Sequence, residues 1–121
     1  MELQKLFKKD AWTSNESREL LKYSSILRSR HLECIPIILR SKKIQLSKVQ
    51  FCLRPSTPVI ALFDLVRKHS NGKLASTEGI FLIIDNVIPL SSLPIGLYAC
   101  HINKDIGFLV VDVFTENTFG C

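Results

Sequence analysis

The sequence has 121 residues, which is enough for one domain with a sizeable core but not for several domains. Its 46% of hydrophobic and 22% of charged residues indicate a globular chain and argue against disorder. No apolar run approaches the roughly 20 residues of a membrane-spanning helix. Residues 1–10 contain no signal-peptide core, and the cysteines form no CxxC pair. We therefore expect a cytoplasmic protein with free thiols at Cys34, Cys52, Cys100 and Cys121.

Charge is distributed unevenly along the chain. Residues 1–73 hold 15 of the 16 lysines and arginines and six acidic residues, a net charge of +9, whereas residues 74–121 carry −4. Such a basic half can be attracted to an anionic surface. Solvated helix faces explain the same pattern, so both interpretations stay open.

The N-terminal part predicts two helices. Residues 2–9 form a short one, and a longer one runs to about residue 31. The longer helix begins at Thr13-x-x-Glu16, which fits a capping box, although Ser14 competes as the N-cap. Its apolar positions recur with helical spacing at Leu20, Tyr23 and Leu27.

Two strands follow these helices. Residues 34–40 are strand-like, and Pro36 places the beginning of that strand near an edge or margin of the sheet. Residues 41–48 form a polar connection. Residues 49–55 alternate weakly and pair back as a hairpin that Pro55 ends.

A third helix has clear start and stop signals. Thr57 is its predicted N-cap and Pro58 its first helical residue. Basic residues 67–69 occupy the last turn, where the helix dipole favours positive charge, and the helix is predicted to end at Asn71-Gly72. Its apolar residues are Val59, Leu62, Phe63 and Val66.

The last third predicts two more strands. Residues 79–84 are almost continuously apolar and predict a strand buried on both faces or nearly so. A turn at 85–86, a short helix at 93–100 and a turn at 103–105 lead to a final strand at 108–114. The order of the elements indicates an α+β fold. It is the β-grasp of ubiquitin-like domains, with a four-stranded mixed sheet, a crossing helix and a helical N-terminal extension.

A polar segment at 115–118 and the tripeptide Phe119-Gly120-Cys121 follow the final strand. Glycine has no Cβ, so its backbone can pass through a narrow slot and present an unhindered carbonyl carbon to a nucleophile. This suggests acyl transfer performed on the tail by other proteins. A frayed terminus is the simpler alternative.

The sequence contains no catalytic constellation. His31, His69 and His101 lack a second ligand at metal-binding spacing, and there is no phosphate-binding loop or nucleophile elbow. Asp112 and Glu116 do not make an acid–base pair, because one is expected in a strand and the other in the tail. We expect a protein without catalytic activity, metal or cofactor, on which enzymes act.

Five stretches form a recognisable series along the chain: IPIIL (35–39), VQFCLRPSTPVIALFDLVRK (49–68), GIFLIIDNVIP (79–89), LY (97–98) and KDIGFLVVDVFTENTFG (104–120). The most specific are the DNVIP turn and the GFL…ENTFG ending at their separation. Together with the helical N-terminal part, these stretches resemble the autophagy ubiquitin-like modifier family that includes GABARAP over almost the whole chain. The resemblance implies a helical extension at 1–32 and a ubiquitin-like domain with a conjugation tail at 33–121, forming one structural unit.

The resemblance implies conjugation to a lipid. A cysteine protease would cut after Gly120 and remove Cys121, with Thr118 and Phe119 threading into the processing enzymes. Activating and conjugating enzymes would then link Gly120 to phosphatidylethanolamine on the autophagosomal membrane. An amide to a two-chain lipid gives stable anchoring.

The resemblance also implies a peptide-binding groove. A peptide with an aromatic and an aliphatic anchor, from a cargo receptor or adaptor, would add a strand at residues 51–53. Lys48 would meet acidic residues before the motif. The predicted first pocket comprises Pro36, Ile38, Cys52 and Phe108 with Leu27 nearby, and the second comprises Phe51, Leu53, Leu62 and Leu65.

Several residues depart from the family pattern. Cys52 replaces a leucine, which would enlarge the first pocket, and Arg54 stands where proline is usual. Tyr23 and Cys34 are also unusual, and the connection at 41–48 is shorter than in typical members.

Two other functions remain open. The chain could be a ubiquitin-like interaction module that is never conjugated, in which case its tail would stay intact. Alternatively, the basic half could bind nucleic acid or another anionic surface, with strong salt dependence. We expect no nucleic acid, because no aromatic-rich basic strand or nucleic-acid motif is present.

Overall fold

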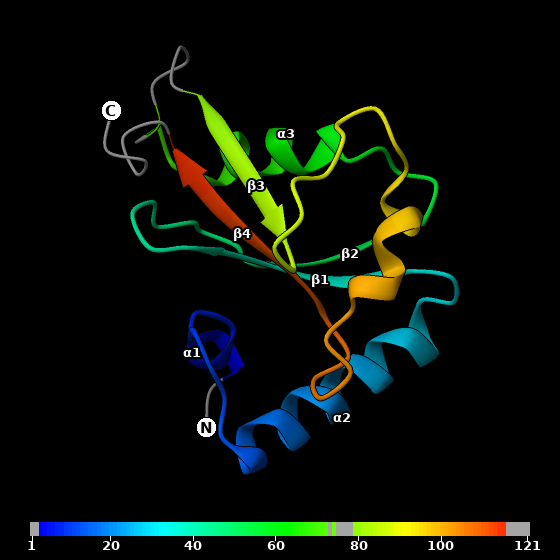
Figure 1. Ribbon diagram of the computed structural model, residues 1–121. Coiled ribbons are helices and arrows are strands. Elements are labelled where there is room, and N and C mark those ends of the chain that lie inside the picture. Colours follow the sequence, from blue (N-terminus) through cyan, green and yellow to red (C-terminus); the bar gives the residue numbers. More distant parts are fainter. Residues whose placement is uncertain (1–2, 73, 75–78, 116–121) are drawn as a thin grey trace.

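The computed structural model describes residues 3–72, 74 and 79–115. Helices α1 and α2 lie on one side of a sheet and α3 on the other (Figure 1). The elements in chain order are α1 (Leu3–Phe7), α2 (Ser14–Arg30), β1 (Ile35–Ser41), β2 (Gln50–Leu53), α3 (Ile60–His69), β3 (Ile80–Ile84), the 3-10 helix η1 (Ile95–His101) and β4 (Leu109–Thr115).

The sheet has four strands in the order β2-β1-β4-β3. The two inner strands, β1 and β4, are parallel, while β2 and β3 pair antiparallel to their neighbours. The hairpin β1–β2 and the crossing helix α3 confirm the predicted β-grasp. Each outer strand, β2 and β3, pairs with a single neighbouring strand in the described part of the sheet, and the position of β2 matters for the site below.

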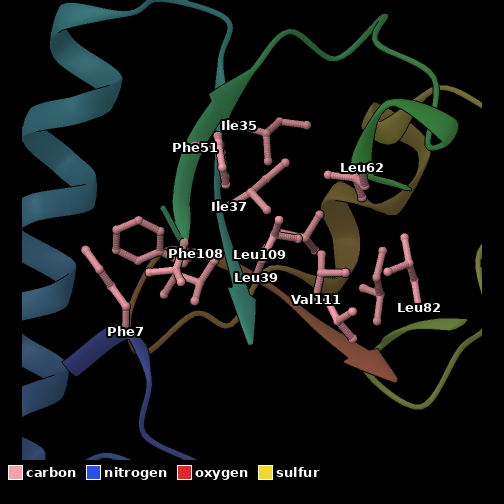
Figure 2. Packing of buried hydrophobic residues seen from close by; sticks show 14 of the residues in the cluster. Phe7, Ile35, Ile37, Leu39, Phe51, Leu62, Leu82, Phe108, Leu109 and Val111 are labelled. Carbon is pink, nitrogen blue, oxygen red and sulfur yellow. The ribbon is translucent and has the colours of Figure 1, made fainter. Parts of the chain in front are cut away.

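The larger core lies on the face of the sheet toward α3, here called the α3 face. Residues directly opposite each other on paired strands point to the same face, so Ile37 and Leu109 lie together, as do Leu82 and Val113. Figure 2 shows these strand side chains packed toward Leu62 of α3. The buried residues of this core are Ile35, Ile37, Leu39, Phe51, Leu62, Val66, Leu82, Ile84, Leu109, Val111 and Val113.

On the opposite side, here called the α2 face, three aromatic rings join the N-terminal helices to the sheet. The ring centroid of Phe108 lies 5.7 Å from that of Phe7 and 6.3 Å from that of Tyr23. Phe108 is fully buried as a result (Figure 2). The helical extension is therefore part of the core on this face.

Polar contacts fix the start of α2. Thr13 is the N-cap, and it forms the complete capping box with Glu16, so the predicted signal is confirmed in preference to Ser14. Lys9 Nζ lies 2.6 Å from a carboxylate oxygen of Glu16. The Lys9 contact and the bond from the Thr13 backbone lower the pKa of Glu16 below its usual range.

Arg40 fastens the link between α1 and α2 to the sheet. Its guanidinium donates to both carboxylate oxygens of Asp112 and to the backbone oxygens of Lys9 and Asp10. It also lies over the ring of Trp12, 5.4 Å from the centroid. One side chain thus joins β1, β4 and the interhelical link.

Gly107 brings the chain close to α2 just before β4. Its φ is +75°, and a Cβ there would collide with the side-chain oxygen of Ser24. Ser24 donates to the backbone oxygen of Ile106, and Arg28 donates to that of Gly107. The turn that starts β4 therefore rests directly on the helix.

The predicted start of α3 is wrong. Thr57 does not cap the helix and Pro58 is not its first residue, since α3 begins at Ile60 without a side-chain cap. Pro58 instead forms a bridge with Pro94, and the Val59 N–H donates to the oxygen of Leu93. Contacts with a distant loop override the local capping signal.

The predicted burial is wrong in two segments. β3 is buried on one face only, with Phe81 39% exposed, because β3 is an outer strand and none of the helices in the described part of the chain covers its α2 face (Figure 1). The connection at 41–48, predicted to be polar, contributes the buried side chains of Ile44 and Leu46 to the core. The short helix at 93–100 forms as the 3-10 helix η1.

Candidate peptide-binding edge

Strand β2 is an outer strand, and among the described residues it pairs only with β1. Pro36 lies opposite Cys52, and it has no N–H with which to complete a hydrogen-bonded pair. Hydrogen-bonded and non-hydrogen-bonded pairs alternate along an antiparallel ladder. Accordingly, the Leu39 N–H donates to the oxygen of Val49 further along the hairpin, at 2.8 Å. The N–H and C=O of Cys52 therefore point away from β1.

The pairing geometry shows which residue of the predicted edge, 51–53, has backbone groups available to an added strand. Phe51 and Leu53 direct their backbone groups toward β1, so Cys52 is the residue of the three that offers both groups to an added strand. The position of Pro36 also agrees with the prediction of a sheet margin, because β1 pairs with β4 only from Ile37 onward.

The two predicted pockets fall on opposite faces of the sheet. Cys52 lies opposite Pro36, and together with Ile38 they lie on the α2 face. Phe51 and Leu53 lie opposite Ile37 and Ile35, on the α3 face. The structure thus places the two predicted sets on opposite faces of the sheet, toward which successive side chains of an added strand would point.

Burial divides the predicted pocket residues into two groups. Cys52, Leu53 and Leu65 are partly exposed and pack against the core, and Lys48 is exposed. The other predicted residues are buried and can only form the floor of a pocket: Pro36, Ile38, Phe51, Leu62, Phe108 and Leu27.

Polar side chains surround the edge. Lys48 Nζ lies 5.0 Å from the ring centroid of Phe51. Gln50 Nε2 donates to the backbone oxygen of Phe51, and it lies 3.6 Å from Cys52 Sγ. Gln50 is a neighbour of the edge that the sequence did not reveal, although the alternation of side chains along β2 could have placed it on the face of Cys52.

The predicted conjugation tail, including Thr118, Phe119, Gly120 and Cys121, lies outside the described residues. The part of the tail segment that the structure describes is Thr115, the last residue of β4. Its side chain is buried, and it pairs with Ile80 of β3. β4 therefore leads from the core of the domain to the predicted tail.

Two of the histidines, His69 and His101, have polar side-chain neighbours. His69 Nδ1 lies 3.1 Å from the hydroxyl of Ser47, and His101 Nδ1 lies 3.0 Å from a carboxylate oxygen of Asp85. Residues 3–72, 74 and 79–115 contain no group of three metal-ligating side chains. No helix within these residues is long and apolar enough to cross a membrane.

A mixed four-stranded sheet crossed by α3 and extended by two N-terminal helices defines a ubiquitin-like domain of the autophagy type. A search of known family profiles gave no match to the chain. The chain is 30% identical over 99 residues to autophagy-related protein 8 of Dictyostelium discoideum, which covers 78% of this chain and 80% of that protein.

Two solved structures share the fold. The crystal structure of ATG8 from Trypanosoma brucei superposes with a TM-score of 0.72 at 20% identity, over 89% of this chain and 92% of that one. Plasmodium falciparum Atg8, solved in complex with a peptide of P. falciparum Atg3, gives 0.65 at 20% identity, over 81% and 89%. The chain belongs to the autophagy-related protein 8 family, as the sequence resemblance predicted. It is a ubiquitin-like protein of autophagy.

Proposed function

We propose that this chain is a modifier that is conjugated through Gly120 to phosphatidylethanolamine and that docks short peptides at the β2 edge. The observation that carries the docking proposal is the free backbone of Cys52 between two apolar faces. The similar P. falciparum protein, solved with an Atg3 peptide, supports binding of peptides in this family. The same proposal places the protein in the cytoplasm and, after conjugation, on the autophagosomal membrane.

The proposed conjugation requires partners that work in sequence. A cysteine protease would cut after Gly120, and an activating enzyme and a conjugating enzyme would then carry the glycine as an acyl group. Thr118 and Phe119 would lie in the entry slots of these enzymes. Support comes from membership of the family and from glycine at the position where a side chain would obstruct attack on the carbonyl carbon.

The docking peptides would come from cargo receptors or adaptors, with one anchor on each side of Cys52. Lys48, which is exposed, would attract acidic residues of the peptide. For so small a contact we expect dissociation constants near the micromolar range, about −8 kcal/mol.

Intact mass in native cytosol tests the conjugation proposal. The wild type should lose Cys121 and gain the mass of the lipid, whereas Gly120→Ala should do neither. A variant that lacks Cys121 is the matched control, because it should be conjugated without the protease. Retention of Cys121 in the wild type would instead support an interaction module that is never conjugated.

Peptide titration tests the docking proposal. Leu53→Arg places a charge beside the free backbone of Cys52 and should abolish binding of a two-anchor peptide. Ile88→Arg is the control, because Ile88 is 69% exposed and follows β3, at the opposite edge of the sheet. Unchanged affinity of Leu53→Arg for the peptide would show that the β2 edge is not the docking site. Circular dichroism should show that both variants are folded.

A further inference from the structure

After Leu53 the chain makes a turn at residues 54–57, here called the rim, which backbone hydrogen bonds hold in place. The Thr57 N–H donates to the oxygen of Arg54 at 2.9 Å, which closes a turn, and the Gly96 N–H donates to the oxygen of Pro55 at 2.9 Å. A Cβ on Gly96 would lie 2.8 Å from the Cβ of Pro55, so η1 presses directly against the turn. The turn that follows β2 is therefore held against η1.

Two hollows lie against this rim. One has a volume of about 480 Å³ and the other about 310 Å³, and they share Glu33 and Pro55. Ile35, which lines the smaller hollow, lies opposite Leu53 in the hairpin, so the hollows begin where the β2 edge ends. An extended peptide paired with Cys52 advances about 3.3 Å per residue, and two residues bring it level with Arg54.

The lining combines an exposed aliphatic side chain with guanidinium groups. Leu32, in the larger hollow, is 80% exposed. Arg54 is exposed, and within the described part of the chain its side chain has no hydrogen bond or ion pair. Arg28 lines the smaller hollow and is held by its bond to the oxygen of Gly107. Glu33 is the carboxylate among the lining residues.

We propose that these hollows form an extension subsite for the same peptide that docks at β2, and this rests on the proposed docking function. An aliphatic residue of the peptide would cover Leu32 and Pro55, and an acidic residue would pair with Arg54. Two guanidinium groups against one carboxylate give the subsite a positive balance that favours an acidic continuation of the peptide. With Lys48 at the other end of β2, the edge has a cation at both ends.

The experiment uses a two-anchor core peptide and two longer versions, extended by Leu-Glu-Glu either after or before the core. Calorimetry with the full-length protein gives the affinities. The extension that reaches Arg54 should tighten binding about tenfold, which corresponds to about 1.4 kcal/mol. Any gain from the extension at the other end should come from Lys48 and should be lost in Lys48→Glu, so the end whose gain survives in Lys48→Glu reports the direction of the added strand.

Variants assign the gain to the subsite. Arg54→Glu and Leu32→Ser should each remove most of the gain and leave the affinity of the core peptide unchanged. Glu33→Gln should increase the gain for Leu-Glu-Glu but not for Leu-Gln-Gln. Lys48→Glu is the control, since it reverses an exposed cation at the other end of β2 and should preserve the gain. All four residues are exposed, so the variants should fold.

The outcomes separate this inference from the proposed function. If the core peptide binds the wild type and neither extension adds affinity, the subsite is wrong and the docking edge stands. A gain that survives in Arg54→Glu and Leu32→Ser as well as in Lys48→Glu also overturns the subsite. If neither the core nor the extended peptides bind, the docking function and the subsite both fall.

Discussion

The two faces of the sheet are held by different kinds of interaction. On the α3 face, apolar side chains of four strands and α3 bury one another, and α3 begins without a side-chain cap. On the α2 face, the aromatic cluster is accompanied by bonds from side chains to distant backbone, made by Arg40, Ser24 and Arg28. Apolar burial holds two layers together without specifying which atoms meet, because the hydrophobic effect is not directional. Hydrogen bonds are directional, so each one holds a particular segment in place. The difference predicts distinct responses to mutation.

The largest effect should come from the α3 face. Leu62→Ala removes a fully buried side chain, and we expect the free energy of unfolding to fall by about 3 to 4 kcal/mol. Urea denaturation measures this loss. Leu90→Ala is the control, because Leu90 is 62% exposed and should cost less than about 0.5 kcal/mol. Equal losses in the two variants would contradict the assignment of the core.

Gly107→Ala tests the close approach between the β4 turn and α2. The positive φ and the collision with Ser24 should together lower the free energy of unfolding by about 2 to 3 kcal/mol. Gly72→Ala separates the two causes, because Gly72 has the same φ of +75° and a Cβ there would meet no atom within 4 Å. If the two variants lose equal stability, the packing of Gly107 on Ser24 contributes nothing.

Arg40→Met tests the polar fastening of the α1–α2 link. Methionine keeps the apolar stem but removes the bonds to Asp112 and to the two backbone oxygens, so we expect a loss of about 2 kcal/mol. Hydrogen exchange should accelerate at residues 8–12. Lys42→Met is the control, since Lys42 is exposed and its contact with Asp10 is 3.6 Å, and its effect should stay below about 0.5 kcal/mol. Unchanged exchange in Arg40→Met would show that the link is held by other contacts.

The smallest expected effect is a change in folding stability with pH. Because the bond from Lys9 holds the pKa of Glu16 below its ordinary value of about 4.3, ionised Glu16 stabilises the fold above that pH. This contribution is lost as the pH falls through the lowered pKa of the folded state. Glu16→Gln should therefore be less stable than the wild type at pH 7, and the difference should shrink below about pH 4. Thermal melts at several pH values measure it, and a difference independent of pH would refute the role of the charge.

Elements on both faces of the sheet were predictable where they depend on local patterning. The apolar spacing of α3 and the runs that form β1 and β4 follow from the periods of helix and strand, and the capping box of α2 follows from Thr13 and Glu16. The same patterns failed where distant contacts compete. Pro58 pairs with Pro94 and so begins no helix, and β3 is exposed on one face because of its place in the sheet.

The candidate site shows the same division. The sequence, through its resemblance to the family, divided the pocket residues into two sets, and cross-strand pairing puts these sets on opposite faces of the sheet. It could not reveal that Ile38, Phe108 and Leu62 are fully buried, because burial depends on what α1, α2 and α3 cover. Nor could it reveal the hollows beside Arg54, which need η1 and the end of α2 to meet the turn after β2.

By itself, the sequence determined the element order, the β-grasp class, the family and the glycine proposed for conjugation, because these depend on local patterns and motifs. Only the tertiary structure decided which groups at β2 are free. Pro36 and Cys52 must lie opposite each other before the missing N–H of one directs the backbone of the other outward. The fastening by Arg40 likewise joins residues about 30 and 72 positions apart, and no local pattern encodes such a contact.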